Sequence, residues 1–573
     1  MKNKPKLDLS WYSSLVKILP DAEWLPSGCS QGETLRNERF NFQLLVHSPN
    51  MHNRMAQIRL ETDLPCPVRI RQTYGVPVTF AGFPKADNDV ITTENRIIPD
   101  RLKDLENSAM RIIIRRRSTL WFSVDVSANS PAGDYKIQLH FTVYPDDCDE
   151  DPTQKVETFS TTAYRLRILD HALPEQRLKV TQWLHPDCLS AWYSVPMWSE
   201  AHWHILENYI RNAAIHGMNM LLTPLFSLML NVLQGKRREL TQLLILSRKD
   251  GRYHFDFSRF DRFIRLAQKC GIRYFEISHF FSQWGAAYAP PVEVDGALLL
   301  DGTQPGDHEE YVKILDSLLP ALKIHLAELG IGSRTVFHCS DEPGKLHTER
   351  YKKAMSLLRK HLPEGQFHIL DAINDAEVYA RCGMDLPVPL TVQLHKFRSL
   401  KLSERWTYYC CTPVRKAANR FIHFPSSRNR ILGVLLWKYG VDGFLHWGYN
   451  FYFEALSRGL VDPEKDPTSG EFYPPGDAFV VYPAPDGTAD DSIRHEVFLE
   501  ALQDFRALDL LAQLTGRAFV QKMLLQWAGG KLTMTEYPRG EKALLELRHK
   551  IHQAIRRAAD TVSFPALDRN EVI

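Results

Sequence analysis

Between residues 180 and 447, short apolar runs of β type alternate with segments of helical spacing. Short apolar runs bounded by turn residues favour buried strands, and a 3.6-residue period favours helices. Eight such units over about 270 residues match the size of a (β/α)8 barrel. The expected strands are 180–185, 218–224, 272–280, 335–340, 366–371, 390–394, 407–410 and 443–447. The sequence therefore predicts a central TIM-type barrel, and a doubly wound parallel sheet is the alternative.

The first part of the chain, residues 1–174, contains apolar and polar residues in alternation but no long helical period. Alternation is typical of half-buried strands, so we expect a β-sandwich domain. Turn residues at 130–134 separate two alternating runs, which predicts a hairpin between them. The expected strands are 40–46, 111–115, 120–126, 135–143 and 161–169.

The last part of the chain, residues 491–573, carries apolar residues at helical spacing. Such stripes are usually packing faces, so we expect C-terminal helices that pack on the barrel. The predicted organisation is a sandwich domain at 1–174, a catalytic barrel at 175–490 and a helical segment at 491–573.

Composition limits the function classes. A chain of 573 residues with 24% charged residues and a formal net charge of +2 is unlike a nucleic-acid-binding protein. We find no apolar run that predicts a signal peptide or a membrane span. Nine scattered cysteines suit a reducing compartment. We therefore expect a cytoplasmic protein with no nucleic-acid or membrane partner, and a homo-oligomer is left open.

One expected strand leads directly into two adjacent carboxylates. Residues 335–343 read Thr-Val-Phe-His-Cys-Ser-Asp-Glu-Pro, so Asp341 and Glu342 follow the fourth strand. In parallel barrels the chemistry lies just past the carboxyl ends of the strands. An isolated Asp-Glu-Pro is more often a solvated turn, but the surrounding pattern favours a catalytic pair.

The other expected strand ends carry aromatic and polar side chains on the same rim. Aromatic faces can stack on a sugar ring while polar groups bind its hydroxyls, so together they predict a carbohydrate site. Glu276 also falls on this rim, and so does either Tyr408 or Tyr409. The predicted substrate-binding residues are Trp183, His185, His279, His338, Asp371, Gln393, Tyr409, Trp447, Tyr449 and Asn450.

Several histidines fall at these strand ends, but the sequence has no His-Glu-x-x-His motif and no paired Cys-x-x-Cys. No glycine-rich phosphate loop precedes a helix. We therefore expect no metal site and no cofactor.

The pair Asp341-Glu342 after a barrel strand resembles the catalytic pair of glycoside hydrolase family 123, the N-acetyl-β-galactosaminidases and their uncharacterised relatives. Further segments resemble that family in the correct order along most of the chain. They are 38–46, the hairpin-like 121–135 with Pro-Ala-Gly-Asp-Tyr, the last barrel strand 443–450, and 476–477, 482–483, 492–494 and 500–505.

The resemblance implies retaining, substrate-assisted hydrolysis of β-linked N-acetylhexosaminides, with N-acetylgalactosamine as the favoured sugar and an oligosaccharide or glycoconjugate as substrate. Glu342 would protonate the leaving oxygen, and Asp341 would hold the acetamido group. Geometry gives independent support, because two neighbouring residues on one loop cannot easily straddle a sugar ring as an acid and a nucleophile about 5 Å apart.

Two alternatives remain open. One is a non-catalytic carbohydrate-binding protein on the same fold. The other is a two-carboxylate glycosidase for ordinary hexosides, with Glu276 or Asp371 as the nucleophile.

Overall fold

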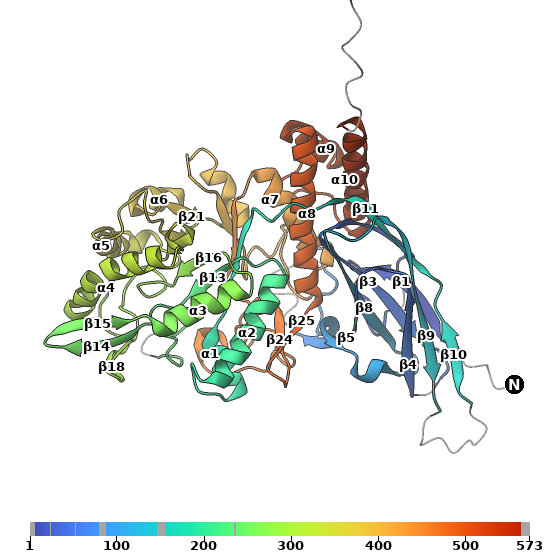
Figure 1. The fold of residues 1–573 in the computed structure, drawn as a ribbon, viewed down its shortest axis with the longest axis horizontal. Coiled ribbons are helices and arrows are strands. Elements are labelled where there is room, and N and C mark those ends of the chain that lie inside the picture. The colour runs from blue at the N-terminus through green and yellow to red at the C-terminus, as the bar shows by residue number, and fades with distance from the viewer. Residues whose placement is uncertain are drawn as a thin grey trace, which may run out of the picture.

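The computed structural model describes residues 6–22, 25–51, 53–79, 87–145, 155–233 and 236–562. The chain has several parts: N-terminal β-sheets, a central α/β region and C-terminal helices (Figure 1). The C-terminal helices stand between the sheets and the α/β region and contact both. This confirms the predicted multidomain order.

The N-terminal part consists of two sheets whose apolar faces pack on each other. In the first sheet the strand order is β1 (Asp8–Ser13), β3 (Glu38–His47), β8 (Arg117–Val126), β5 (Val68–Val78) and β6 (Arg96–Asp104). In the second it is β2 (Gln31–Arg36), β11 (Tyr164–Ala172), β9 (Gly133–Val143), β4 (Arg54–Thr62) and β7 (Ala109–Ile112), with β10 (Glu157–Ser160) on β9. All pairings are antiparallel except β2 with β11.

Aromatic side chains from both sheets form the centre of this core. Phe42 stacks on Phe122 at 4.9 Å and on Tyr164 at 4.1 Å between ring centroids, and Trp11 meets all three rings edge-on or tilted. Stacked and tilted aromatic pairs add stability beyond the area that they bury. The alternation read from the sequence therefore does mark inward and outward faces.

The predicted hairpin between 120–126 and 135–143 is wrong. β8 pairs with β3 and β5 in one sheet, whereas β9 pairs with β4, β10 and β11 in the other. The turn residues at 130–134 carry the chain across the core instead of folding it back on the same sheet. Alternation could not separate these cases, because strands that pair and strands that face each other both bury every second residue.

The central region contains eight parallel strands in the expected order. They are β12 (Lys179–Gln182), β13 (Met220–Thr223), β16 (Tyr274–Ile277), β19 (Thr335–Phe337), β20 (Leu370–Ala372), β21 (Leu386–Val388), β22 (Trp406–Tyr408) and β23 (Gly443–His446). The helices are α1 (Pro186–Tyr193), α2 (Glu200–Ile215), α3 (Ser258–Lys269), α4 (Glu309–Glu328), α5 (Thr348–Arg359), α6 (Ala376–Cys382) and α7 (Ser426–Tyr439). Ser199 caps α2 by accepting the backbone N–H of His202, as a serine N-cap should.

The parallel strands are linked in three groups. β22 and β12 both pair with β23, β16 pairs with β13 and β19, and β20 pairs with β21. Single bridges, Phe337 with Ile369 and Leu390 with Tyr408, join neighbouring groups. Between β12 and β13 the described residues form no ladder, although the Asn219 N–H donates to Val180 O at 3.1 Å. The region is α/β as predicted, with its helices outside the strands (Figure 1).

The sixth strand differs from the prediction. The expected strand 390–394 lies mostly on a 3₁₀ helix, η4 (Thr391–Phe397), and the strand is β21. Two prolines, Pro387 and Pro389, obscured β21, because proline lacks the N–H that a ladder uses. The carbonyl of Pro389, just after β21, accepts the Tyr408 N–H at 3.1 Å, so the acceptor that proline retains links this segment to β22.

The remaining strands form short antiparallel hairpins at the edge of the α/β region. They are β14 (Ile245–Lys249) with β15 (Arg252–Asp256), β17 (Val292–Val294) with β18 (Ala297–Leu300), and β24 (Val481–Pro483) with β25 (Ala489–Asp491).

The C-terminal helices are α8 (Ile493–Thr515), α9 (Arg517–Trp527) and α10 (Glu541–Val562). They confirm the helical spacing read from the sequence. α8 crosses α7 so closely that a Cβ on Gly433 would lie 1.8 Å from Ala501 O. Within the described ranges, no helix combines the length and the apolar character that crossing a bilayer requires.

Candidate active site

The backbone after β19 is held in place by one buried carboxylate. Asp371, at the middle of β20, accepts the N–H groups of Cys339 at 3.1 Å and Ser340 at 3.2 Å. The same oxygen accepts the Tyr351 hydroxyl at 2.6 Å. Asp371 is fully buried, and burial raises the pKa of its carboxyl. It therefore fixes the path of the chain that leads to the Asp341-Glu342 pair.

His338 bridges two strands through both of its ring nitrogens. Nδ1 lies 3.1 Å from Asp371 Oδ1, and Nε2 lies 3.0 Å from Glu276 Oε2. Burial alone would lower the pKa of His338, but the hydrogen bonds and charges of Asp371 and Glu276 outweigh it and raise the pKa to about 9. At neutral pH the ring is therefore an imidazolium held between two carboxylates.

The two adjacent carboxyl groups have different surroundings. Asp341 is buried, and its Oδ2 accepts the Gln283 amide at 2.8 Å. Burial, followed by the charge of Glu342, raises the pKa of Asp341 well above its usual value. Glu342 is half-buried, and its Oε1 accepts the Tyr408 hydroxyl at 2.5 Å. Its φ of 49° lies in the left-handed region, which is uncommon for glutamate and frequent at functional sites.

An aromatic group lies next to the His338 ring. His279 stacks on His338 at 4.4 Å, and Trp183 meets both rings edge-on. The Trp183 indole N–H donates to Glu276 at 3.2 Å. Both nitrogens of His279 are buried without a hydrogen-bond partner among the described residues, and burial holds its pKa well below the usual value. The structure therefore brings Trp183, His279, His338 and Asp371 together in contact.

Trp447 follows β23 and is half-buried. Its indole N–H donates to Asp477 at 3.0 Å, and its ring packs on Tyr473 at 5.0 Å. Asp477 is fully buried, which raises the pKa of its carboxyl to about 7 against the lowering effect of the Trp447 bond. The Trp447 ring is therefore held in one orientation, with part of its surface exposed.

Other predicted binding residues are committed to internal contacts. The amide of Asn450 bonds the backbone N–H and carbonyl of His185, at 2.8 and 3.1 Å, and His185 Nε2 lies 3.0 Å from Trp447 O. The Tyr449 hydroxyl donates to Asn212 and to Tyr209 O, and its ring is fully buried.

Tyr409 and Gln393 likewise have no described contact with the acidic pair. Tyr409 is fully buried against Phe444 and His446, with no hydrogen bond from its hydroxyl within the described part of the chain. Gln393 lies on η4, and its side-chain oxygen is buried without a partner among the described residues.

Sequence reasoning left Tyr408 and Tyr409 as alternatives and chose Tyr409, and it missed Gln283; in the structure Tyr408 and Gln283 bind Glu342 and Asp341 directly. The period of two could have separated Tyr408 from Tyr409, because neighbouring strand residues point to opposite faces. Gln283 lies in the loop after β16, and no local pattern marks it.

Two clusters each offer three ligand atoms within cation distance: His279, His338 and Asp371, and His216, Asp491 and His495. In the first, both nitrogens of His338 already face carboxylates. In the second, His216 Nε2 lies 3.1 Å from an Arg39 guanidinium nitrogen. A cation would have to displace a proton or a guanidinium in either cluster, so neither carries a metal assignment.

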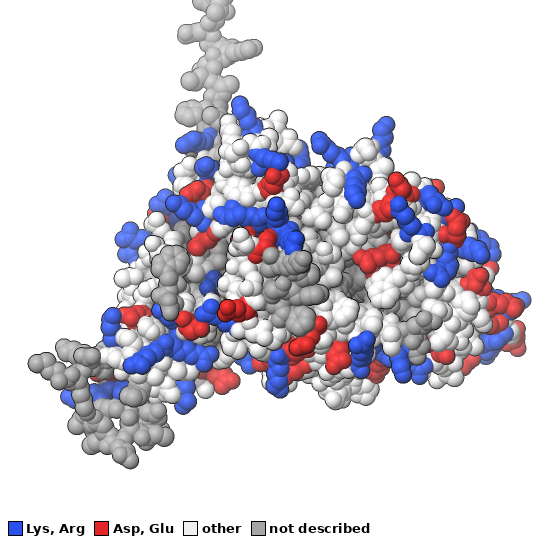
Figure 2. Space-filling view, turned by 180° about the vertical axis from the view of Figure 1, so that it is seen from behind, with Lys and Arg blue, Asp and Glu red and all other residues white. Residues whose placement is uncertain are grey.

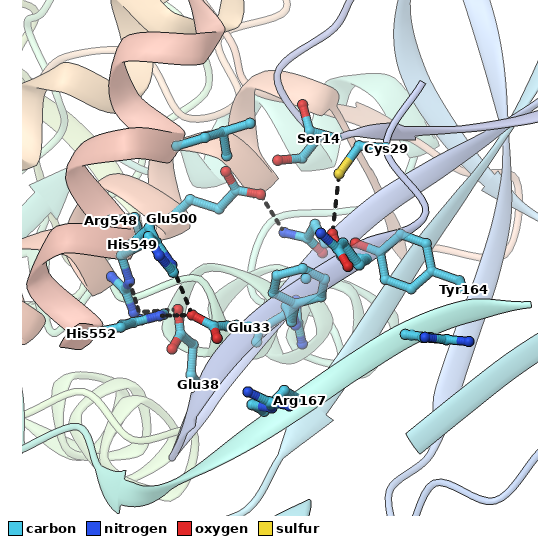
Figure 3. A pocket seen from close by; sticks show the side chains of 18 of the residues that line it. Ser14, Cys29, Glu33, Glu38, Tyr164, Arg167, Glu500, Arg548, His549 and His552 are labelled. Atoms are coloured by element: carbon cyan, nitrogen blue, oxygen red, sulfur yellow. Dashed lines mark hydrogen bonds and ion pairs between the residues drawn. The ribbon is translucent and has the colours of Figure 1, made fainter. Parts of the chain in front are cut away.

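A separate cavity of about 750 Å³ lies between the sandwich and α10 (Figure 3). Charged groups that line it are paired with one another: the buried Arg548 bonds Glu38 at 2.7 Å, and the half-buried Glu33 lies 3.1 Å from the exposed His549. Because these charged groups pair with each other across the contact between the sandwich and α10, we interpret the cavity as a gap at the boundary between domains. Residues 28–32 at its edge match Gly-x-Ser-x-Gly, but they lead into β2 and not into a helix, so they form no nucleophile elbow.

The surface charge is mixed. On the face shown in Figure 2, basic and acidic side chains are interspersed among the coloured residues. This agrees with the formal net charge of +2 and gives that face no extended basic surface.

Comparisons with known proteins match this geometry to one family. The model of the glycoside hydrolase 123 catalytic domain matches residues 183–511, more than half of the chain. A family 123 glycoside hydrolase from Clostridium perfringens, studied for glycolipid glycan hydrolysis, has the same fold, with a TM-score of 0.69 and 15% identity over 97% of this chain and 99% of that one. β-Glucuronidase 3 from Bacteroides uniformis is a far weaker likeness, with a TM-score of 0.26 and 10% identity over 82% of this chain and 50% of that one. No curated protein sequence matches. The family match covers Asp341 and Glu342 and confirms the resemblance seen in the sequence, so this chain belongs to glycoside hydrolase family 123.

Proposed function

We propose that this protein hydrolyses β-linked N-acetylhexosaminides, with N-acetylgalactosamine as the favoured sugar, by a retaining mechanism in which the substrate's acetamido group is the nucleophile. Membership of a glycoside hydrolase family supports the reaction class. The finer proposal is carried by the adjacent carboxyl groups of Asp341 and Glu342 at the end of β19, each bound by a different neighbour.

In this mechanism Glu342 is the general acid and base. It is the more exposed of the two carboxyl groups, so it can reach the leaving oxygen and later a water molecule. The Tyr408 hydroxyl, 2.5 Å from Glu342 Oε1, fixes the direction in which the carboxyl group points. A fixed direction matters because proton transfer requires hydrogen-bond geometry at the reacting oxygen.

Asp341 holds the acetamido N–H and stabilises the positive charge of the oxazolinium intermediate. Its burial supports this role, since a charge acts more strongly where water is excluded. Gln283 holds the carboxyl group from the protein side. The raised pKa of Asp341 means that its deprotonated form is costly in the empty site, and a developing positive charge on the sugar would favour that form.

A two-carboxylate mechanism is less well supported. Glu276 and Asp371 are both fully buried and both bonded to His338. To act as a nucleophile, either would have to leave the imidazolium and reach the sugar. A non-catalytic binding protein would not need a half-buried glutamate beside a fully buried aspartate, and turnover measurements separate it from an enzyme.

We further propose that the eight parallel strands close into a (β/α)8 barrel with the acidic pair on its carboxyl rim. The pairing of β23 with both β12 and β22 supports closure, and the Asn219–Val180 hydrogen bond supports the contact of β12 with β13. The half-exposed Trp447 would form an apolar wall for the sugar.

We also propose, as the sequence suggests, that the protein is cytoplasmic, and a homo-oligomer is left open.

The test is a panel of aryl β-glycosides of N-acetylgalactosamine, N-acetylglucosamine, galactose and glucose. We expect turnover only with the N-acetyl sugars, retention of the anomeric configuration in the first product, and inhibition by an N-acetyl thiazoline mimic. Equal cleavage of galactosides, or a covalent sugar ester trapped on Glu276 or Asp371, would contradict acetamido participation. Binding without turnover across the panel would favour the non-catalytic alternative.

A further inference from the structure

Cys410 and Cys411 form a pair of adjacent thiols that the proposed reaction does not use. They follow β22 and stand two and three residues after Tyr408, which bonds Glu342. Their Sγ atoms are 3.7 Å apart, and both residues are half-buried. The backbone is fixed, because the Asn419 amide donates to Cys410 O at 2.9 Å and the Cys410 N–H donates to Thr412 O at 3.0 Å.

This spacing suits an ion held between two sulfurs better than a disulfide. Consecutive Cα atoms across a trans peptide are about 3.8 Å apart, below the range of about 4.4–6.8 Å that disulfides usually require. Two sulfurs bound at about 2.3 Å to one centre lie about 3.4–3.8 Å apart for bond angles between about 95° (pyramidal) and 110° (tetrahedral), a range that includes the observed separation. The pair is therefore already near the geometry of a two-thiolate ligand.

The surroundings of the pair are acidic and buried. Asp477 is fully buried; its Oδ2 accepts the Trp447 indole N–H, and its Oδ1 lies 3.5 Å from His446 Nε2. Cys410 stands two residues after Tyr408, whose hydroxyl bonds Glu342, so the thiol pair lies at the strand end that carries the Glu342 partner. The charges of Asp477 and Glu342 also act on the Cys410 thiol. The hydrogen bond to Cys411, burial and these charges together raise the pKa of Cys410 well above its usual value. A single-site electrophile should therefore react slowly here, because the thiolate is the nucleophile.

We propose that Cys410 and Cys411 together bind one soft, thiophilic ion, of the class that includes trivalent arsenic, beside Glu342 in the candidate active site. With phenylarsine oxide, two As–S bonds form, the As–O bond is lost, and the two thiol protons leave with that oxygen as one water molecule. No oxidant is needed. Closure of a chelate by two thiols drives proton release that a single thiol would not undergo.

The consequence for activity rests on the proposed glycosidase function. An arsenic atom on these sulfurs would lie at the end of the strand that carries Tyr408, the donor that orients Glu342 for protonation of the leaving group. Bound arsenical should therefore block turnover, and a small dithiol that removes the arsenical should restore it.

The first test measures binding and does not depend on activity. The reduced full chain is incubated with phenylarsine oxide, and its intact mass is determined. We expect one phenylarsenic group per chain in the wild type and in Cys29→Ser, a control in the sandwich, and none in Cys410→Ser or Cys411→Ser. An adduct that persists in both serine variants, or none in the wild type, would overturn the site. Using two variants guards against misfolding of either one.

The second test measures turnover of an aryl N-acetylgalactosaminide, with each variant compared to its own untreated rate. Wild-type activity should fall in step with the adduct and return after treatment with 2,3-dimercaptopropanol, while the serine variants should keep their own rates. An adduct without inhibition would refute the position beside Glu342. If no sugar is turned over at all, the proposed function fails, and the mass measurement still decides whether the two thiols bind the ion.

Discussion

Two neighbouring tyrosines at the end of β22 occupy opposite environments. The Tyr408 hydroxyl donates to Glu342 at 2.5 Å and accepts the Asn374 amide at 3.1 Å. The Tyr409 hydroxyl is buried with no partner among the described residues. A hydrogen bond to a charged group is worth about 1.5–3 kcal/mol, whereas removing an unpaired buried hydroxyl costs little.

Tyr408→Phe should therefore lower kcat by roughly 10- to 100-fold on a substrate with a poor leaving group, because Glu342 loses the donor that orients it. Tyr409→Phe is the matched control and should keep kcat and the thermal midpoint near those of the wild type. Steady-state kinetics of both variants on one N-acetylgalactosaminide provide the check. Equal losses in the two would mean that the Tyr408–Glu342 bond has no part in turnover.

The roles of the acidic pair can be separated by leaving groups. Glu342→Gln should lose about 10²–10⁴-fold in kcat on alkyl glycosides, and much less on an activated aryl glycoside that needs no protonation. Asp341→Asn should lose turnover on both substrates, because it stabilises the charged intermediate. The ratio of kcat values on the two substrates is the measurement. The reverse pattern would exchange the two roles.

At the scale of elements, the His338 bridge ties β19 to β16 and β20 and makes their stability depend on pH. The folded pKa of about 9 lies above the ordinary value of 6.5. The bridge therefore contributes fully below about pH 6.5, and its contribution is lost as pH rises through about 9. The loss amounts to up to about 3 kcal/mol.

The wild-type thermal midpoint should accordingly fall between pH 6.5 and 9.5. In Glu276→Gln one of the two carboxylates that stabilise the imidazolium is gone, so the folded pKa of His338 is lower; the fall should still begin near pH 6.5, but it should be smaller and should end at a lower pH. Calorimetric scans across this pH range are the measurement. A Glu276→Gln midpoint with the wild-type pH dependence would mean that His338 does not control it.

The crossing of α7 and α8 requires glycine at one position. A Cβ on Gly433 would lie 1.8 Å from the backbone oxygen of Ala501, and no side chain can move to relieve that contact. Gly433→Ala should therefore destabilise the protein by at least about 1–3 kcal/mol, the usual cost of overpacking. Gly332→Ala, whose Cβ would come no closer than 4.0 Å to Leu326 O, is the control. Thermal midpoints of the two variants would show whether the contact can relax.

The same elements show what sequence periodicity can and cannot predict. Seven of the eight parallel strands overlap their predictions because each apolar run is bounded by turn residues, and the acidic pair follows from its place after β19. The predicted position of the sixth strand was wrong because Pro387 and Pro389 interrupt the strand pattern around β21. The predicted pairing of β8 with β9 was wrong because a period of two identifies the buried face of a strand but not its partner strand. Gln283 could not be found, since a loop residue is brought to Asp341 only by tertiary structure.

At the scale of the whole molecule, Arg548 of α10 joins the sandwich to α8, which packs on α7 of the α/β region. Its guanidinium bonds Glu38 of β3 and Asp504 of α8, each at 2.7 Å, and all three residues are buried. Asp504 is also bonded by Arg430 of α7. One cation on the last helix therefore neutralises carboxylates that belong to two different parts of the chain.

Arg548→Ala should leave Glu38 without its cation and Asp504 with only one, at the contact between sandwich and helices. Breaking a buried ion pair by removing one partner costs about 3–5 kcal/mol, because the remaining charge stays buried. Since that cost falls on the contact between domains, we expect the sandwich to unfold at a lower temperature than the α/β region, which would split the calorimetric transition. Lys550→Ala, which removes an exposed charge from the same helix, should leave the trace unchanged within about 0.5 kcal/mol. A trace for Arg548→Ala that overlays that of Lys550→Ala would mean that the Arg548 ion pairs add nothing measurable to the contact between the domains.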